Sequence, residues 1–206
     1  MKPGEFIALS ACTMTLTALG IDIMLPAFGE VRDHFSLSAD STDTAQIISF
    51  FFMGQVAQMI FGALSDRFGR IAILRVGFPL YIVGGIVAAL APDLPTMLAA
   101  RFLAGMGASA VFMTTIAGVR DRFVGDGMAR VLSLIFTIFL FTPVIAPFLG
   151  LAIMSVGSWK MVFSYAAIVC RRGVLMVAAA GRITPGRATY AAQPRTRGAL
   201  DHARDR

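Results

Sequence analysis

Two charged side chains lie inside long apolar stretches of this chain, where their chemistry would be reversible proton binding. Asp22 lies within the apolar residues 6–28, and Arg101 lies within the apolar residues 94–119. A charge inside a bilayer is costly unless it faces a partner or a polar cavity, and an acid's proton affinity depends on its neighbours. At about 1.5 Å per residue, both side chains lie roughly 9 to 10 Å from the outer ends of their expected helices. We therefore predict that Asp22 and Arg101 meet and that their pairing couples to proton binding.

A purely structural interpretation of the same two residues stays open. Arg101 can brace neighbouring helices by hydrogen bonding to their backbone carbonyls, and Asp22 can cap the outer end of its own helix. The two interpretations differ in the partner of the guanidinium, which is a carboxylate in the first and a carbonyl oxygen in the second.

The elements that must position these charges are membrane helices. Hydrophobic residues make up 57% of the 206-residue chain and charged residues only 15%. A helix needs about twenty apolar residues to cross the roughly 30 Å hydrocarbon layer. A cleaved signal peptide is an alternative for the first stretch, but Asp22 and Pro26 interrupt the place where a cleavage site should lie. The sequence thus predicts an all-α membrane protein with five clear spans, at residues 6–28, 44–64, 73–91, 94–119 and 131–156.

A sixth span should begin near Trp159, but the sequence interrupts it. Arg171 and Arg172 would fall near its middle and oppose insertion by about 5 to 7 kcal/mol together. We therefore divide the chain into a transmembrane unit at residues 1–169, with an incomplete sixth helix, and a basic low-complexity tail at residues 170–206. The tail is expected to be disordered or to arise from a change of reading frame. The alternative is a genuine basic tail held at the anionic inner leaflet.

Lysine and arginine in the connections predict the orientation of the chain. With a cytoplasmic amino terminus, seven basic residues lie inside and only Arg32 and Lys160 lie outside. The first outer connection is the longest and most polar one. The formal charge of +6 does not favour a nucleic-acid partner, because residues 1–170 hold ten basic and ten acidic side chains and the excess is in the tail. The acidic residues of that outer connection are Glu30, Asp33, Asp40 and Asp43.

A short charged motif separates the second and third predicted spans. Glycine, acid and base recur in it at Gly62, Asp66, Arg67, Gly69 and Arg70, which we expect to form a tight cytoplasmic hairpin. As a bare charge pattern, the motif fits a solvated loop that obeys the positive-inside rule. As a full run, it resembles the signature between helices two and three of the major facilitator superfamily.

Further residues narrow the resemblance to the drug and proton antiporters, and most closely to the Bcr/CflA type of multidrug exporter. The arginine motif of the superfamily resembles the stretch around Arg101, although Ala104 stands where glutamine is common. The antiporter motif resembles Pro143, Pro147 and Gly150, although Leu151 stands where a second glycine is common. Similar patterns also occur at Asp22, Leu25 and Pro26, at Gly54 and Gln55, and at Trp159 and Phe163.

The two prolines of the antiporter motif predict a bent fifth span. Pro143 and Pro147 are four residues apart, so they share one helix face, and each removes a backbone hydrogen bond. Gly150 lies on roughly the same side and allows close approach to another helix, which would suit packing against an opposite half of a transporter. A static kink without a gating role is the alternative.

The resemblance implies an inner-membrane exporter of small amphipathic drugs, driven by the proton gradient and requiring no cofactor. Such transporters have two six-helix halves, and this chain contains one at most. It either works after pairing with a second chain, or it is a non-transporting membrane fragment. The cysteines, Cys12 and Cys170, lie far apart in apolar sequence and support neither a disulfide nor a metal site. The spans hold no histidine and no paired carboxylates, so we expect no enzyme activity.

Overall fold

The computed structural model describes residues 3–38 and 42–164. Within these residues every regular element is helical. A further short helical stretch, residues 159–164, follows the last complete helix. In chain order the elements are α1 (Pro3–Asp22), the 3-10 helix η1 (Leu25–Ala27), α2 (Phe28–His34), α3 (Asp43–Gln55), α4 (Gln58–Phe68), α5 (Arg70–Ala89), α6 (Leu94–Arg122) and α7 (Gly125–Met154).

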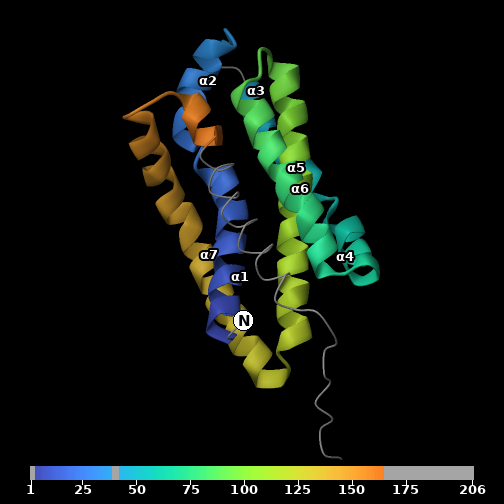
Figure 1. The fold of residues 1–206 in the computed structure, drawn as a ribbon. Helices are drawn as coiled ribbons and strands as arrows, with labels where there is room; N and C mark the ends of the chain where they lie inside the picture. The colour runs from blue at the N-terminus through green and yellow to red at the C-terminus, as the bar shows by residue number, and fades with distance from the viewer. Residues whose placement is uncertain (1–2, 39–41, 165–206) are drawn as a thin grey trace, which may run out of the picture.

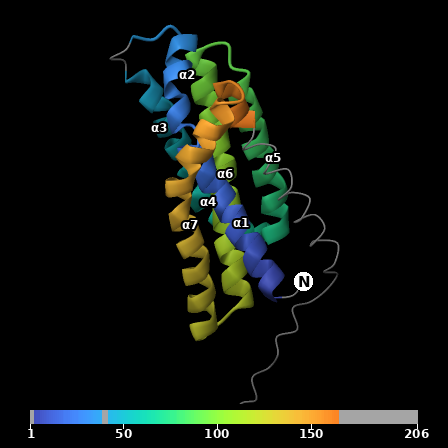
Figure 2. The same ribbon diagram turned by 90° about the vertical axis from the view of Figure 1, so that its left-hand side faces the viewer.

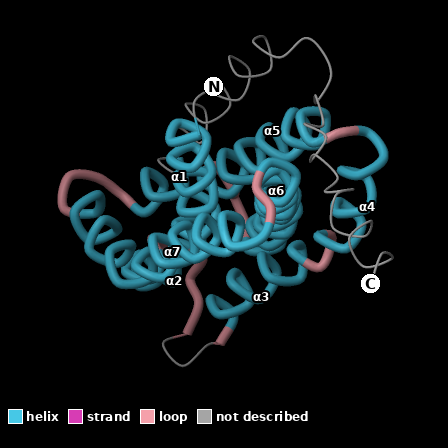
Figure 3. The backbone as a smooth tube through the Cα atoms, turned by 90° about the horizontal axis from the view of Figure 1, so that it is seen from below, coloured by secondary structure: helices cyan, strands magenta, loops and turns pink. Residues whose placement is uncertain are grey.

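The long helices run side by side as a bundle, with α6 in the middle. α6 contacts α1, α3, α4, α5 and α7, and its contact with α5 is the most extensive one. Figures 1 and 2 show α1 beside α7, and α3 and α5 both pack against α6. Seen end-on, α6 lies among α1, α3 and α5 (Figure 3). Arg101 is therefore carried by the helix that touches most of the others.

Five stretches of the described chain are long and apolar enough to cross a membrane, which confirms the five predicted spans. The first stretch joins α1, η1 and α2, and the second joins α3 and α4 across a turn at residues 56–57. The five stretches are Pro3–His34, Asp43–Phe68, Arg70–Ala89, Leu94–Arg122 and Gly125–Met154. The described part of this membrane protein is thus all-helical, with the number of clear spans that the sequence indicates.

The connection between the first two spans is shorter than predicted. Glu30 and Asp33, expected in a polar loop, lie instead in α2. The chain turns after Asp22, and Pro26 then occupies the start of η1, where its missing N–H removes no helical hydrogen bond. The first stretch therefore stays helical up to His34. Figure 1 shows α2 at the end of the bundle opposite the amino terminus.

The charged motif after the second span is also more helical than predicted. α4 continues to Phe68, α5 begins at Arg70, and Gly69 alone makes the turn. Gly69 has φ +90° and ψ 151°, a backbone conformation that a residue with a Cβ atom rarely adopts. The motif is therefore two helix ends joined by one glycine.

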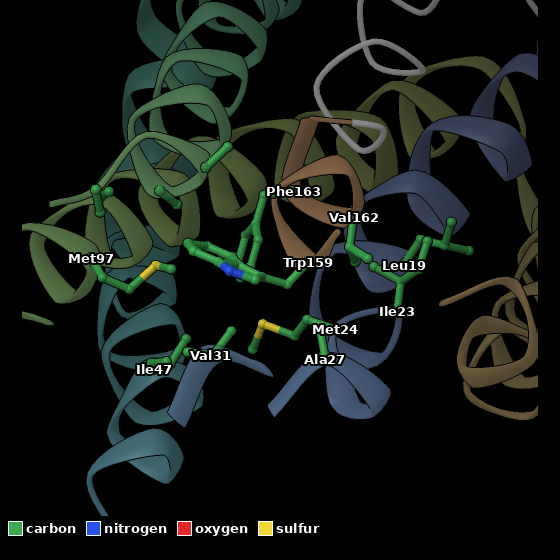
Figure 4. Close-up of a cluster of buried hydrophobic side chains, with 14 of the residues drawn as sticks. Leu19, Ile23, Met24, Ala27, Val31, Ile47, Met97, Trp159, Val162 and Phe163 are labelled. Atoms are coloured by element: carbon green, nitrogen blue, oxygen red, sulfur yellow. The ribbon is translucent and has the colours of Figure 1, made fainter. Parts of the chain in front are cut away.

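A cluster of buried apolar side chains closes the α2 end of the bundle. Trp159 and Phe163 are each 4% exposed, and Val162 is fully buried. They pack with residues of α1, η1, α2, α3, α5 and α6, and Figure 4 shows Trp159 in the middle of the labelled side chains. The members of this cluster that are labelled in Figure 4 are Leu19, Ile23, Met24, Ala27, Val31, Ile47, Met97, Trp159, Val162 and Phe163.

The helical turn at residues 159–164 agrees with the predicted start of a sixth helix near Trp159. The interruption predicted at Arg171 and Arg172, and the tail at residues 170–206, lie outside the described residues.

Candidate functional site

Arg101 of α6 is buried in the bundle, with only 3% of its surface exposed. Its Nη2 donates a hydrogen bond of 2.9 Å to the carbonyl oxygen of Gly20 in α1. The guanidinium carbon lies 4.4 Å from the ring centroid of Phe51 in α3 and 5.6 Å from that of Phe163. A planar cation between aromatic rings gains both packing and electrostatic attraction. Arg101 thus ties α1, α3 and residues 159–164 to α6.

A cavity of about 10 Å³ adjoins this arginine, enough for one water molecule at most. Its lining includes Gly20, Tyr81, Arg101 and Phe163. Among the described residues, the Nε of Arg101 is buried and has no hydrogen-bond partner. In the part of the chain that the structure describes, the guanidinium is therefore held by the Gly20 carbonyl and by aromatic rings.

Asp22 lies half-buried on a different face of α1. It lines a second cavity, of about 290 Å³, together with Gln55 and Gln58 at the junction of α3 and α4. Aromatic rings from three helices and Pro143 of α7 complete one side of this cavity. We call it the Asp22 cavity; the rings are those of Phe52, Phe112 and Phe139.

The predicted contact between Asp22 and Arg101 is wrong. Within the described residues no ion pair joins them, and they line different cavities. Arg101 lies level with the end of α1, where it contacts Gly20, but Asp22 points in another direction around the helix axis. Gly20 and Asp22 are two residues apart, which rotates them by about 200° around α1. Since Gly20 faces Arg101, Asp22 must point away, and the carbonyl-bracing alternative describes the observed contact of Arg101.

The charged motif builds a second polar site at the far end of the bundle. Arg70 forms ion pairs with Asp66 of α4 and with Asp121 of α6, the latter through Nε to Oδ2 at 2.7 Å and Nη2 to Oδ1 at 3.2 Å. Its Nη1 also donates to the hydroxyl of Ser65 at 3.0 Å. The motif residues thus connect to α6, and Asp121 was not among the residues singled out from the sequence. The available signal was an acid between two arginines, at positions 120 and 122.

The remaining motif residues surround this network. Gly62 lies beside Met113 of α6, and a Cβ atom there would be 3.8 Å from its methyl group, an ordinary contact. Arg67 is exposed and places its guanidinium 5.6 Å from the ring centroid of Phe68. Gly62, Asp66, Arg70 and Asp121 line a cavity of about 220 Å³.

α7 runs as one helix through both prolines of the antiporter motif. Pro143 is exposed and lines the Asp22 cavity, whereas Pro147 is half-buried. Gly150 is buried against the turn that follows α1, where a Cβ atom would lie 2.2 Å from the carbonyl oxygen of Ile23. The predicted close approach of Gly150 is confirmed, and it is made to the turn between α1 and η1.

A similar backbone contact fixes α3 on α6. A Cβ atom on Gly105 would lie 2.0 Å from the carbonyl oxygen of Phe51, and one on Gly54 would lie 2.2 Å from that of Phe102. No side chain separates the two helices at this point, so Phe51 is held directly over Arg101.

The geometry fits no metal centre in the described part of the chain, where no three His, Cys, Asp or Glu side chains cluster. It does fit a membrane environment. Large apolar side chains are exposed along α3, α4 and α7, where lipid or further helices can cover them. Examples are Phe52, Met53, Val56, Met59 and Ile60 on α3, α4 and the turn between them, and Leu140, Phe141, Val144, Ile145 and Phe148 on α7.

Comparison with known proteins settles the family. Residues 10–199 match the Major Facilitator Superfamily. The chain belongs to this superfamily. It is 33% identical over 182 residues to the uncharacterized MFS-type transporter YdgK of Bacillus subtilis, an alignment covering 84% of this chain and 44% of that protein. It is also 33% identical over 166 residues to the multidrug resistance protein MdtL of Shigella dysenteriae, and equally to MdtL of Escherichia coli O81, covering 80% of this chain and 42% of each relative.

These matches define both the class of the protein and the extent of the chain. A member of the superfamily with five membrane-spanning helices is a multi-pass transporter-type protein, and its fold is that of an N-terminal half. The chain spans less than half the length of the curated relatives that it matches.

Proposed function

We propose that this chain is the N-terminal half of a proton-coupled exporter of small drug-like molecules, of the Bcr/CflA type. The observation that carries the proposal is the Asp22 cavity, in which one carboxylate faces amide side chains and aromatic rings. An apolar cavity with a few polar groups is the usual form of a small-molecule site. The name of the MdtL relatives, multidrug resistance protein, supports the substrate class.

In this proposal Asp22 binds and releases the proton, and Arg101 acts through the backbone. Arg101 holds the carbonyl of Gly20, two residues before Asp22, and so sets the position of this part of α1 against α6. A carboxylate that faces a polar cavity can change its protonation as the cavity opens to either side of the membrane. The energy source is the proton gradient, and no cofactor takes part.

The orientation proposed here places the amino terminus in the cytoplasm of a bacterial-type cell and the protein in its inner membrane. The Arg70 network and the connection between α6 and α7 then lie at the cytoplasmic end, together with most of the basic residues outside the tail. The α2 end of the bundle faces outward.

Transport by this route needs a second six-helix half, because an alternating cavity forms between two repeats. The partner is a missing C-terminal half or a second chain. A non-transporting membrane fragment is the alternative. Translation of the downstream DNA in three frames separates the two: a coding sequence for further helices supports the transporter, and stop codons in every frame support the fragment.

Export by the restored full-length protein tests the role of Asp22. The variant Asp22→Asn keeps the side-chain shape but cannot release a proton, so proton-driven export of a fluorescent drug from cells should be lost. Asp33→Asn, which changes an exposed acid in α2, serves as the matched control and should export normally. Undiminished export by the Asp22 variant at equal expression would refute the proposed coupling.

A further inference from the structure

One hydrogen bond joins two segments of the α2 end that are 129 positions apart in sequence. The backbone N–H of Trp159 donates to Oε2 of Glu30 at 3.0 Å. Glu30 itself is exposed on α2, whereas Trp159 is buried. An exposed carboxylate therefore holds the backbone of a residue whose side chain is buried.

The indole ring of Trp159 is surrounded by further groups of the same region. Its centroid lies 5.1 Å from the ring of His34 and 6.1 Å from that of Phe35. The Nζ of Lys160 lies 5.6 Å from the indole, on the solvent side of the segment. The end of α2 thus covers one side of Trp159 with rings while Glu30 holds its backbone.

The contact extends from Trp159 to the buried arginine. Phe163, one helical turn further on, packs edge-on against Trp159 with a centroid separation of 5.7 Å. The same Phe163 ring lies 5.6 Å from the guanidinium carbon of Arg101. A continuous series of contacts therefore leads from exposed Glu30, through Trp159 and Phe163, to Arg101.

We propose that Glu30 is a positioning residue that fixes residues 159–164 on the bundle and thereby holds Phe163 against Arg101. Apolar burial alone does not fix how residues 159–164 sit on the bundle, because the hydrophobic effect is non-directional. A hydrogen bond to a charged acceptor is directional and stronger than a neutral one, so it selects one placement of the Trp159 backbone. The inference concerns the packing around Arg101 and does not rest on drug export.

The chain itself offers a selective probe, because Trp159 is its single tryptophan. Hydrogen exchange of the Trp159 amide and acrylamide quenching of its fluorescence are measured on the full chain in detergent micelles. In Glu30→Ala we expect about tenfold faster exchange at Trp159 and greater quenching, since a charge-assisted hydrogen bond is lost. Asp33→Ala is the matched control, because it removes another exposed acid of α2 without touching this contact.

Two conservative variants separate the hydrogen bond from general stability. Glu30→Gln keeps the reach and an oxygen acceptor, so its exchange rate at Trp159 should lie between those of the wild type and the alanine variant. Glu30→Asp keeps the charge but is one methylene shorter, so it should exchange faster than Glu30→Gln.

The proposal is overturned if Glu30→Asp exchanges as slowly as the wild type at Trp159, or if Asp33→Ala accelerates exchange as much as Glu30→Ala. The comparison of Glu30→Asp with the wild type applies even if Glu30→Ala does not fold.

Discussion

Arg70 and Arg101 carry the same guanidinium group, but the bundle holds them in opposite ways. Arg70 lies at a helix end with 27% of its side chain exposed and pairs with two carboxylates, those of Asp66 and Asp121. Arg101 is buried, pairs with no carboxylate in the described residues, and is held by a carbonyl oxygen and two aromatic rings. The difference teaches that in this bundle the ion pairs lie where water and headgroups can screen them.

The comparison also separates two kinds of structural cost. An exposed ion pair contributes little because water competes for both partners. A buried arginine, in contrast, fills volume and satisfies a buried carbonyl, so its removal leaves a cavity and an unpaired acceptor. We therefore expect substitutions around Arg101 to affect stability more than substitutions around Arg70.

Removal of the buried arginine should have the largest effect. Arg101→Ala is expected to lower the free energy of unfolding by about 3 kcal/mol, because a cavity opens between Phe51 and Phe163. Arg101→Met refills most of the volume without a charge and should recover most of the loss. Unfolding of the purified chain by a denaturing detergent, followed by circular dichroism, measures both. Arg75→Ala, at an exposed arginine of α5, is the control, and an equal loss there would contradict the comparison.

Separation of α3 from α6 should have the next largest effect. Gly105→Val forces its Cβ atom into the carbonyl of Phe51, so overpacking should cost about 2 kcal/mol and displace Phe51 from Arg101. The same unfolding assay applies. Gly62→Ala meets only the flexible end of Met113 and should unfold like the wild type. Equal stabilities of the two variants would show that the backbone contact between α3 and α6 is not a constraint.

Replacement of Gly69, the turn residue before Arg70, tests whether a substitution at this end of the bundle can lower the stability of the chain. Gly69→Ala should destabilise the chain by about 1 to 2 kcal/mol, because φ is +90° at this position. The cost is one of backbone conformation, since no atom lies within 4 Å of the added Cβ. Gly127→Ala in α7, where the added Cβ also meets open space, should leave the midpoint of thermal unfolding unchanged or raise it.

The exposed ion pair should have the smallest effect. Asp121→Asn removes one carboxylate of the Arg70 network and should cost less than about 1 kcal/mol, because Asp121 is 54% exposed. Salt should abolish the difference between variant and wild type, since about 1 M ionic strength screens such pairs almost completely. Thermal unfolding at low and high salt measures this. A loss as large as that of Arg101→Ala, persisting in salt, would remove the distinction between the two arginines.

The sequence predicted features that depend on length and residue type. The five spans follow from apolar length, and the close backbone contact at Gly150 follows from its residue type. The carbonyl-bracing role of Arg101 was one of two open interpretations. These features are local, or depend only on how far along a helix a residue lies.

Features that depend on the direction of a side chain around its helix were not predicted. The predicted contact between Asp22 and Arg101 is wrong because residues at similar depth need not share a helix face. The two side chains line different cavities. Asp121 joins Arg70 only because α4, α5 and α6 meet at that end. The hydrogen bond between Glu30 and Trp159 could not be predicted without knowing that α2 lies against residues 159–164.

The glycine contact between α3 and α6 has a mechanical consequence. Where two backbones touch, no side chain can change its rotamer to absorb a displacement, so the joint is stiff. Gly54 and Gly105 make such a joint, and Gly107 makes another where its Cβ would lie 2.3 Å from the backbone nitrogen of Tyr81. α3, α5 and α6 should therefore move together as one rigid body. The interface between these three helices and the pair α1 and α7 should be easier to deform. The Arg101–Gly20 hydrogen bond crosses this interface.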